Sequence, residues 1–214
     1  MKVYGHPLST CTRKVFVTLA EKGLAAELLE VDLFTGAHKT PAHLARQPFG
    51  VIPVLEDDGF VVYESRAIIR YLDNRVPSRP LTPSGPKAVA RMDQWLSVDQ
   101  SYVAPHVRAL AVERIVKKHA GGAPDAAAVS SAEEALRNAF RVLDRALEEG
   151  PFLAGESFSL ADVSLMPYVA ALETVGSPEL VAGLRRLGAW WSTVSERPSW
   201  KAASALKASA PAPC

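Results

Sequence analysis

Cysteine is scarce in this chain: only Cys11 and Cys214 occur among its 214 residues, and they lie near opposite ends. Two thiols are too few for a disulfide framework, and this usage suits a reducing compartment. Basic and acidic side chains nearly balance, with a formal net charge of +1, so no strong field concentrates phosphate. We therefore expect a cytoplasmic protein that does not bind nucleic acid.

Long apolar runs are also lacking. No stretch approaches the roughly 18 residues that a membrane-spanning helix needs, and residues 1–7 are not followed by the apolar region of a signal peptide. With 48% hydrophobic and 22% charged residues, the composition is that of an ordinary globular protein. We expect no association with a membrane.

The common catalytic motifs are missing as well. There is no glycine-rich phosphate loop, no G-x-S-x-G elbow and no H-E-x-x-H motif. The histidines do not follow a metal-ligand spacing; they are His6, His38, His43, His106 and His119. A reaction in this protein is therefore expected to rely on binding and electrostatics, without a metal.

The first part of the chain alternates between strand and helix patterns. Gly23 ends an amphipathic helix, Thr40-Pro41 begins a short one, and Asp57–Gly59 is a strong hairpin signal. The expected elements are a strand at 2–4, a helix at 9–22, a strand at 28–31, a short helix from 40, strands at 51–55 and 60–63, and a helix at 65–75. The order βαβ-α-ββα predicts a small α/β domain over residues 1–77.

The rest of the chain has a helical period. Residues 78–86 are rich in proline and are expected to form a linker, and residues 87–207 to form an all-helical domain. Ser130–Glu134 and Ser159–Asp162 each have the pattern of a capping box, so we expect helices to begin there. The tail, residues 208–214, contains small residues and proline and is expected to be disordered.

Four short segments of the α/β part are candidates for chemistry. Ser9 and Glu64-Ser65 stand at helix starts, which are either simply capped or able to hold an anion on their backbone N–H groups. His38-Lys39 is either a solvated loop or a cluster of donors. Pro53, inside a strand-like run, marks an edge strand or a cis bond that leaves the backbone of Ile52 able to hold a ligand.

These segments, in this order, resemble the cytosolic glutathione transferases, and the similarity is closest to the phi class of plants and its bacterial relatives. Each motif is weak alone, but the set is specific and extends over nearly the whole chain. The matching motifs are S-T-C-T-R at 9–13, E-K-G at 21–23, H-K at 38–39, P-F-G at 48–50, I-P-V-L at 52–55, E-S-R-A-I at 64–68, F-S-L-A-D at 158–162 and R-P-S-W at 197–200.

The resemblance implies a thioredoxin-like N-terminal domain that binds glutathione as co-substrate, followed by an all-helical domain, in a homodimer. By position, Ser9 would donate a hydrogen bond to the glutathione sulfur. The implied glutathione contacts are His38 and Lys39 at the glycine carboxylate, Ile52 beside a cis Pro53 at the cysteinyl amide, and Glu64 and Ser65 at the γ-glutamyl end. The implied pocket for an apolar electrophile involves Tyr102, Val103 and His106. Val51 departs from the family pattern, which has Gln there.

The implied reaction is attack of the glutathione thiolate on an apolar electrophile, with peroxidase activity toward organic hydroperoxides as a related activity. Lowering a thiol pKa by about two units requires roughly 2.7 kcal/mol. A hydrogen bond from Ser9 supplies about 1.5–3 kcal/mol of this, and the helix start about 0.3–1 kcal/mol.

Two alternatives stay open. Cys11 lies in the first turn of the same helix, where a thiol pKa can be lowered, so the protein is alternatively a Cys11-dependent thiol transferase. It is otherwise a non-catalytic module of the same fold that binds partners or apolar ligands. Phe49 is a candidate for an aromatic contact with a partner subunit.

Overall fold

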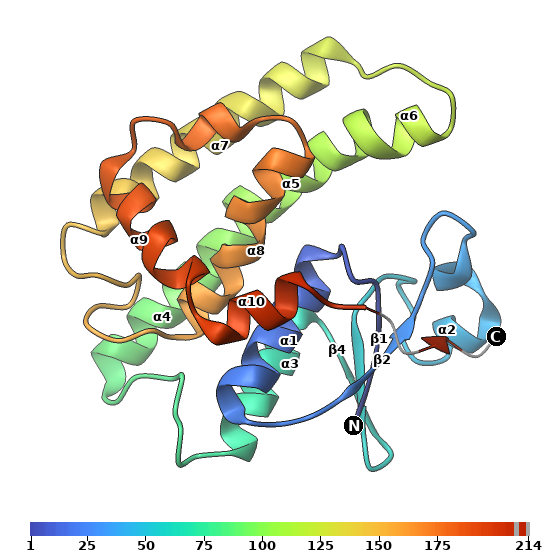
Figure 1. The fold of residues 1–214 in the computed structure, drawn as a ribbon, viewed down its shortest axis with the longest axis horizontal. Coiled ribbons are helices and arrows are strands. Elements are labelled where there is room, and N and C mark those ends of the chain that lie inside the picture. The colour runs from blue at the N-terminus through green and yellow to red at the C-terminus, as the bar shows by residue number, and fades with distance from the viewer. Residues whose placement is uncertain (208–209, 213–214) are drawn as a thin grey trace. The chain divides into compact units, whose positions relative to one another are not determined.

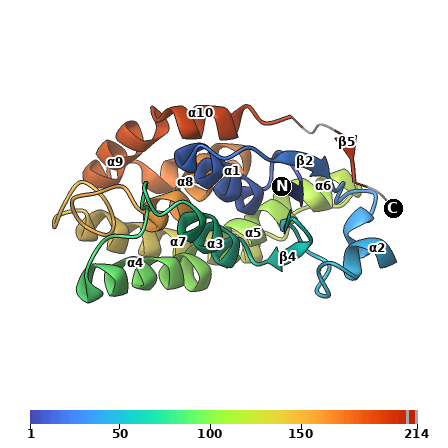
Figure 2. The ribbon, with the colours of Figure 1, turned by 90° about the horizontal axis from the view of Figure 1, so that it is seen from below.

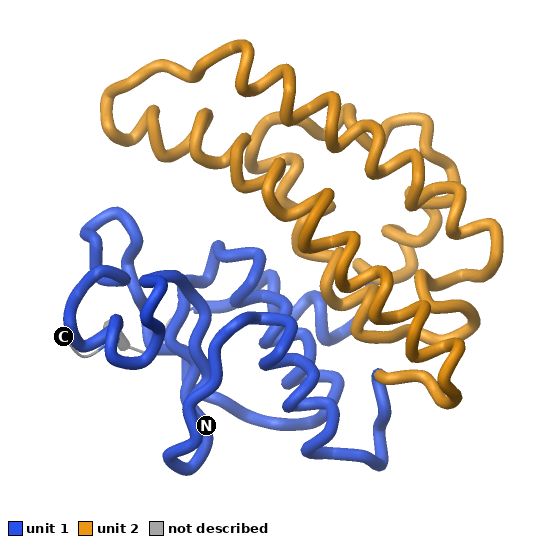
Figure 3. The backbone as a smooth tube through the Cα atoms, turned by 180° about the vertical axis from the view of Figure 1, so that it is seen from behind, with its two compact units in different colours: residues 1–81, 196–214 blue, residues 82–195 orange. Residues whose placement is uncertain are grey.

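The computed structural model describes residues 1–207 and 210–212. The chain divides into two compact units, residues 1–81 together with 196–214 (unit 1) and residues 82–195 (unit 2), which Figure 3 colours separately. Unit 1 contains β1 (Lys2–Gly5), α1 (Thr10–Lys22), β2 (Glu27–Glu30), η1 (Ala37–Lys39), α2 (Pro41–Leu44), β3 (Val54–Asp57), β4 (Phe60–Tyr63), α3 (Ser65–Arg75), α10 (Pro198–Ser204) and β5 (Ala210–Pro211).

The sheet of unit 1 has the order β4-β3-β1-β2-β5, and Figure 1 labels β4, β1 and β2. β2 is parallel to β1 and to β5, whereas β3 is antiparallel to β1 and β4. Val3 pairs with Leu28 and Leu55, and all three are buried. Because successive side chains point to opposite faces, the next row forms a second core on the other face. This core contains Tyr4, Leu29, Val31 and Val54.

Local signals place these elements as expected. Asp58 and Gly59 both have positive φ, 49° and 84°, which joins β3 to β4 as a tight hairpin. Gly23 ends α1 in the left-handed conformation, and the Thr40 side chain caps α2. The predicted βαβ-α-ββα order is therefore confirmed, and the Ile52–Pro53 peptide bond is cis.

The end of the predicted helical domain belongs instead to unit 1. Helices α1, α3 and α10 lie side by side (Figures 1 and 2). Arg197 donates two hydrogen bonds to the carboxylate of Glu21 on α1, at 2.8 and 2.9 Å, and the Ser199 hydroxyl donates a third at 2.5 Å. Burial alone would raise the pKa of Glu21, but the bonds from Arg197 and Ser199 hold it below its ordinary value. A bidentate ion pair thus attaches α10 to α1.

The first residues of the predicted linker are also part of unit 1. Lys22, which is buried, donates to Asp73 Oδ1 at 2.7 Å and to the carbonyl of Arg79. Leu81 donates its backbone N–H to the same Asp73 oxygen at 2.8 Å. The boundary of the unit therefore follows Leu81 rather than residue 77.

The tail differs from the expected disorder in its described part. β5 pairs in parallel with β2, and the Ala212 N–H donates to the Glu30 carbonyl at 2.7 Å. Ala212 also packs against the second core. The remaining tail positions, 208–209 and 213–214, lie outside the described residues, and Cys214 is among them.

Unit 2 is helical throughout its regular elements. These are α4 (Pro86–Val98), η2 (Asp99–Val103), α5 (Ala104–Ala111), η3 (Val112–Val116), α6 (Lys117–His119), α7 (Ala126–Ala146), α8 (Leu160–Thr174), η4 (Pro178–Val181) and α9 (Arg185–Ser195). The elements from α4 to α6 follow one another without a break, and η2 and η3 are π-helical turns. Pro105 lacks the N–H that a regular helix would need at that point, which accounts for the irregular turn before it.

The sequence predicts two helix starts in unit 2 from capping boxes. Ser159 and Asp162 form the box that begins α8, as predicted. The helix expected from Ser130–Glu134 begins earlier, at Ala126. Asp125 accepts from the N–H groups of the next turn and caps α7 there, so the two serines lie inside the helix.

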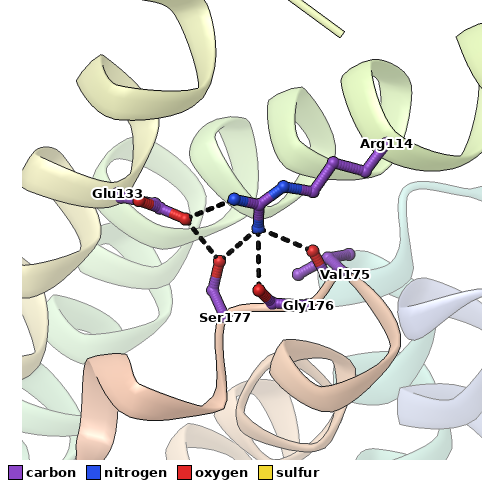
Figure 4. Close-up of polar contacts among 5 residues, drawn as sticks. All are labelled: Arg114, Glu133, Val175, Gly176 and Ser177. Carbon is purple, nitrogen blue, oxygen red and sulfur yellow. Dashed lines mark hydrogen bonds and ion pairs between the residues drawn. The ribbon is translucent and has the colours of Figure 1, made fainter. Parts of the chain in front are cut away.

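A partly buried polar network joins three segments of unit 2 (Figure 4). Arg114 donates to the carbonyls of Val175 and Gly176, at 2.8 and 3.0 Å, and to the Ser177 hydroxyl at 2.5 Å. It also donates to Glu133 Oε1 at 2.7 Å, and Ser177 donates to the same oxygen. The hydrogen bonds from Ser177 and Arg114 lower the pKa of Glu133.

Candidate functional site

Ser9 caps α1 with its side-chain oxygen. Its Oγ accepts from the Thr12 N–H at 3.3 Å, and the Arg13 N–H donates to its carbonyl at 2.9 Å. Gly5, at the end of β1, allows the strand to approach this turn, because a Cβ there would lie 2.5 Å from the Thr12 hydroxyl oxygen. The Ser9 hydroxyl acts as an acceptor in the cap and donates to no group in the described part of the chain. Its hydrogen therefore remains available to an anion at the start of α1.

Cys11 occupies the first turn of the same helix and is half-buried. Three residues further on, where a two-thiol redox motif would have its second cysteine, Lys14 is fully buried. The first turn of α1 thus carries one thiol, two residues after the Ser9 cap.

The His38-Lys39 pair lies in η1, directly against the turn that precedes β3. Lys39 Nζ donates to the Phe49 carbonyl at 3.2 Å. Gly50 has a φ of 61°, and a Cβ on it would lie 2.7 Å from Lys39 Nζ and 2.9 Å from the His38 carbonyl. Only glycine fits this close approach. Burial, together with the nearby charges of Lys39 and His43, lowers the pKa of His38, so at pH 7 its imidazole is neutral.

The turn that ends in Ile52 and cis Pro53 is held by two side chains that sequence reasoning did not single out. His43 Nε2 lies 2.8 Å from the Val51 carbonyl oxygen, and Gln47 Oε1 accepts from the Val51 N–H at 3.4 Å. Both side chains are buried. Their four-residue separation, just before the P-F-G-V-I-P run, is the only signal in the sequence that pointed to them.

Glu64 and Ser65 form the start of α3. Glu64 has a φ of 69° and a ψ of 111°, which a non-glycine residue rarely adopts, and its side chain makes no cap bond. Ser65 is the first helical residue and is buried, so it is not the cap that the sequence suggested. Glu64 thus begins α3 with a strained backbone conformation, and strain of this kind is concentrated at functional sites.

The residues expected to line a second pocket all lie in unit 2. Tyr102 is 61% exposed and His106 is half-buried, but Val103 is fully buried and belongs to the core, so it does not line an accessible surface. Two further exposed apolar side chains, Val112 and Val116, follow along the same helical run. They lie off the buried stripe that contains Val103, Val107 and Leu110.

Two further properties concern the described residues alone. Residues 1–207 and 210–212 contain no group of three or more His, Cys, Asp or Glu side chains that could hold a metal ion. Within the same residues, no helix has the length and apolar character needed to cross a membrane.

Comparisons with known proteins agree on one family. The N-terminal domain of glutathione S-transferase matches residues 8–75, and the C-terminal domain of glutathione S-transferase matches residues 88–198. Glutathione S-transferase 3 of Zea mays is 38% identical over 94% of this chain and 91% of its own length. Glutathione S-transferase hmp2 of Hypomyces subiculosus is 36% identical over 96% and 98%.

Solved structures agree with these matches. Glutathione transferase F7 from Populus trichocarpa is 33% identical, with a TM-score of 0.88 over 95% of this chain and 97% of its own. Glutathione S-transferase I from maize, in complex with an atrazine glutathione conjugate, is 28% identical, with a TM-score of 0.86 over 95% and 96%.

Proposed function

The chain belongs to the glutathione S-transferase family, with plant phi-class enzymes among its relatives, and on this premise we propose that Ser9 stabilises the glutathione thiolate for attack on apolar electrophiles. The fold and the family were both predicted correctly from the sequence. The observation that carries the proposal is the Ser9 hydroxyl, which caps α1 through its oxygen and keeps its hydrogen for the ligand.

The energy of this arrangement is sufficient without a general base. A hydrogen bond from a hydroxyl to a charged group contributes about 1.5–3 kcal/mol. The positive end of α1 adds about 0.3–1 kcal/mol. Together these match the roughly 2.7 kcal/mol that lowers a thiol pKa by about two units. Ser9 therefore acts as a donor to sulfur, not as a nucleophile.

The other ends of the tripeptide are proposed to bind along the same side of unit 1. Lys39 supplies a positive charge for the glycine carboxylate, and the neutral His38 supplies hydrogen bonding rather than charge. Ile52 offers its backbone beside cis Pro53. Glu64 and Ser65, at the uncapped start of α3, hold the γ-glutamyl end.

In the proposed reaction the thiol proton goes to solvent, the thiolate sulfur forms a bond to the electrophilic carbon, and the leaving group departs with the bonding pair. The atrazine conjugate bound by the maize relative supports an apolar aromatic class of electrophile. Tyr102 and His106, together with the exposed Val112 and Val116, are the side chains that we propose contact the electrophile. Peroxidase activity would use the same thiolate on a hydroperoxide oxygen, releasing an alcohol, with a second glutathione giving the disulfide and water.

A homodimer in the cytoplasm is the proposed state of the protein. The scarcity of cysteine supports a reducing compartment. Phe49, Phe60 and Val61, on or beside β4, are 68, 52 and 40% exposed, and a partner subunit packed against them would remove this apolar surface from water. A shift from dimer to monomer for Phe49→Ala in sedimentation would support the proposed contact, and an unchanged dimer would exclude Phe49 from it.

The mechanism is tested with Ser9→Ala and Cys11→Ser, compared in conjugation of chlorodinitrobenzene and in binding to immobilised glutathione. Loss of a charge-assisted bond of about 1.5–3 kcal/mol predicts a fall in kcat of about 10- to 150-fold for Ser9→Ala, with little change in glutathione affinity. Cys11→Ser should keep its turnover. The reverse pattern, with a mixed disulfide on Cys11 in the wild type, would support the thiol transferase. If the wild-type protein shows neither turnover nor thiol exchange, it is a non-catalytic binding module.

A further inference from the structure

His43 and Gln47 meet at the backbone of a single residue, Val51. The two side chains are only 3% and 0% exposed, so neither is a surface group that happens to touch the chain. His43 lies within 2.8 Å of the Val51 carbonyl oxygen, and Gln47 accepts the Val51 N–H at 3.4 Å. Both polar groups of the Val51 backbone are therefore bonded to buried side chains.

The contact with His43 fixes the direction of the following N–H group. A carbonyl oxygen only accepts hydrogen bonds, so the Nε2 atom of His43 carries the hydrogen. The Val51 carbonyl and the Ile52 N–H belong to the same planar trans peptide, in which they point in opposite directions. Holding the carbonyl toward His43 therefore aims the Ile52 N–H away from it.

The turn is also held at its beginning. The Gly50 N–H donates to the Gln47 carbonyl at 3.0 Å, and the His43 N–H donates to the capping hydroxyl of Thr40 at 3.4 Å. His43 and Gln47 are thus themselves anchored, one by the start of α2 and the other by the turn that it closes. The Val51 peptide cannot rotate without breaking a hydrogen bond to one of these buried side chains.

The Gln47 amide has a further property that packing does not explain. Its Nε2 atom is buried and has no hydrogen-bond partner among the described residues. Burying an unpaired amide nitrogen is unfavourable, and an apolar side chain of similar size would avoid it. The amide oxygen is the one bonded polar atom of this side chain, and it accepts the Val51 N–H. This hydrogen bond is therefore the contact that glutamine makes here and an apolar side chain would not.

We propose that His43 and Gln47 are positioning residues for glutathione, which orient the Val51–Ile52 peptide for the backbone contact with the cysteinyl part of the tripeptide. This inference rests on the proposed function. Val51 has no polar side chain, so the backbone is the polar contact that this turn offers, and its orientation decides how well glutathione binds. Because the contact is the same in the ground and transition states, its loss should raise KM and leave kcat unchanged.

The test compares His43→Phe and Gln47→Met with the wild type in steady-state kinetics and in glutathione titration calorimetry. Loss of one oriented backbone bond predicts a rise of about 3- to 10-fold in the KM and Kd for glutathione, with kcat and the KM for the electrophile within about twofold. His43→Gln should restore the wild-type values, because its amide nitrogen can take the place of Nε2. Should His43→Phe fail to fold, Gln47→Met makes the same comparison.

Arg46→Met is the matched control. Arg46 lies in the same segment, stacks on Tyr4 at 4.4 Å and donates to the Ala42 carbonyl, but has no bond to Val51. The Arg46→Met variant should have a lower free energy of unfolding than the wild type and the same KM for glutathione. Unchanged glutathione affinity in His43→Phe and Gln47→Met, or the same rise in Arg46→Met, would overturn the positioning role. Absence of glutathione binding by the wild type would instead refute the proposed function.

Discussion

Replacing Asp162 with alanine gives the sharpest test of the packing in unit 2. Its carboxylate accepts from the N–H groups of Leu153 and Ser159, at 3.0 and 2.9 Å, from the Ser159 hydroxyl at 3.0 Å, and from the Trp190 indole at 2.8 Å. Asp162 is itself fully buried. The substitution therefore leaves three N–H donors without an acceptor.

The size of the effect follows from those donors. Each buried donor without an acceptor costs about 1–3 kcal/mol, so three give about 3–9 kcal/mol, and water entering the space reduces the sum. We expect Asp162→Ala to lower the free energy of unfolding by about 4 kcal/mol. For a chain of this length, that corresponds to a decrease in Tm of about 8–16 °C.

The matched control is Asp125→Ala. Asp125 also stands at a helix start and accepts from two backbone N–H groups, at 2.8 and 3.3 Å, but it is exposed, so water can replace it. Loss of an exposed cap is expected to cost about 1 kcal/mol. Urea unfolding followed by tryptophan fluorescence, at several protein concentrations, measures both variants. Equal destabilisation of the two would refute the argument that burial of the donors sets the magnitude.

Two further predictions concern titratable groups. The hydrogen bonds from Ser177 and Arg114 hold the folded pKa of Glu133 below its ordinary value, so these contacts stabilise the protein above about pH 4.5 and are lost as the pH falls through the lower folded pKa. Glu133→Gln should therefore be less stable than the wild type in urea at pH 7, and the difference should shrink toward pH 3; a constant difference would contradict this. Lys39→Met should raise the KM for glutathione at pH 7 more than His38→Gln, because His38 is neutral there; equal effects would contradict this difference in charge.

The parts of the fold that sequence predicted are those that short-range chemistry decides. Ser9, Gly23, the Asp57–Gly59 hairpin and the Ser159–Asp162 box each act within a few residues, and the structure has them where the sequence placed them. The expected start of α7 was wrong because Asp125 offers an earlier cap of the same kind. Equivalent local signals compete, and the sequence does not rank them.

Long-range contacts decided the rest. The bond between Arg197 and Glu21 joins residues 176 positions apart and moves α10 into unit 1, which no local pattern indicates. Val103 was expected to line a second pocket because of the resemblance, but it is fully buried, in step with Leu96, Val107 and Leu110. Its position on the buried face of that helical run excludes it from an accessible surface.

The starts of α1 and α3, two of the helices of unit 1, show how a helix start can bind two different parts of one ligand. At α1, the Ser9 oxygen takes the Thr12 N–H, so the group offered to a ligand is a hydroxyl hydrogen, which suits the single charged atom of a thiolate. At α3, no side chain caps the first N–H groups of the helix, because the N-cap residue Glu64 has a φ of 69° and its side chain makes no cap bond. The group offered there is the backbone itself, which suits the two oxygens of a carboxylate. The difference between a capped and an uncapped helix start thus sets the orientation of glutathione in the proposed site, with its sulfur at α1 and its γ-glutamyl end at α3.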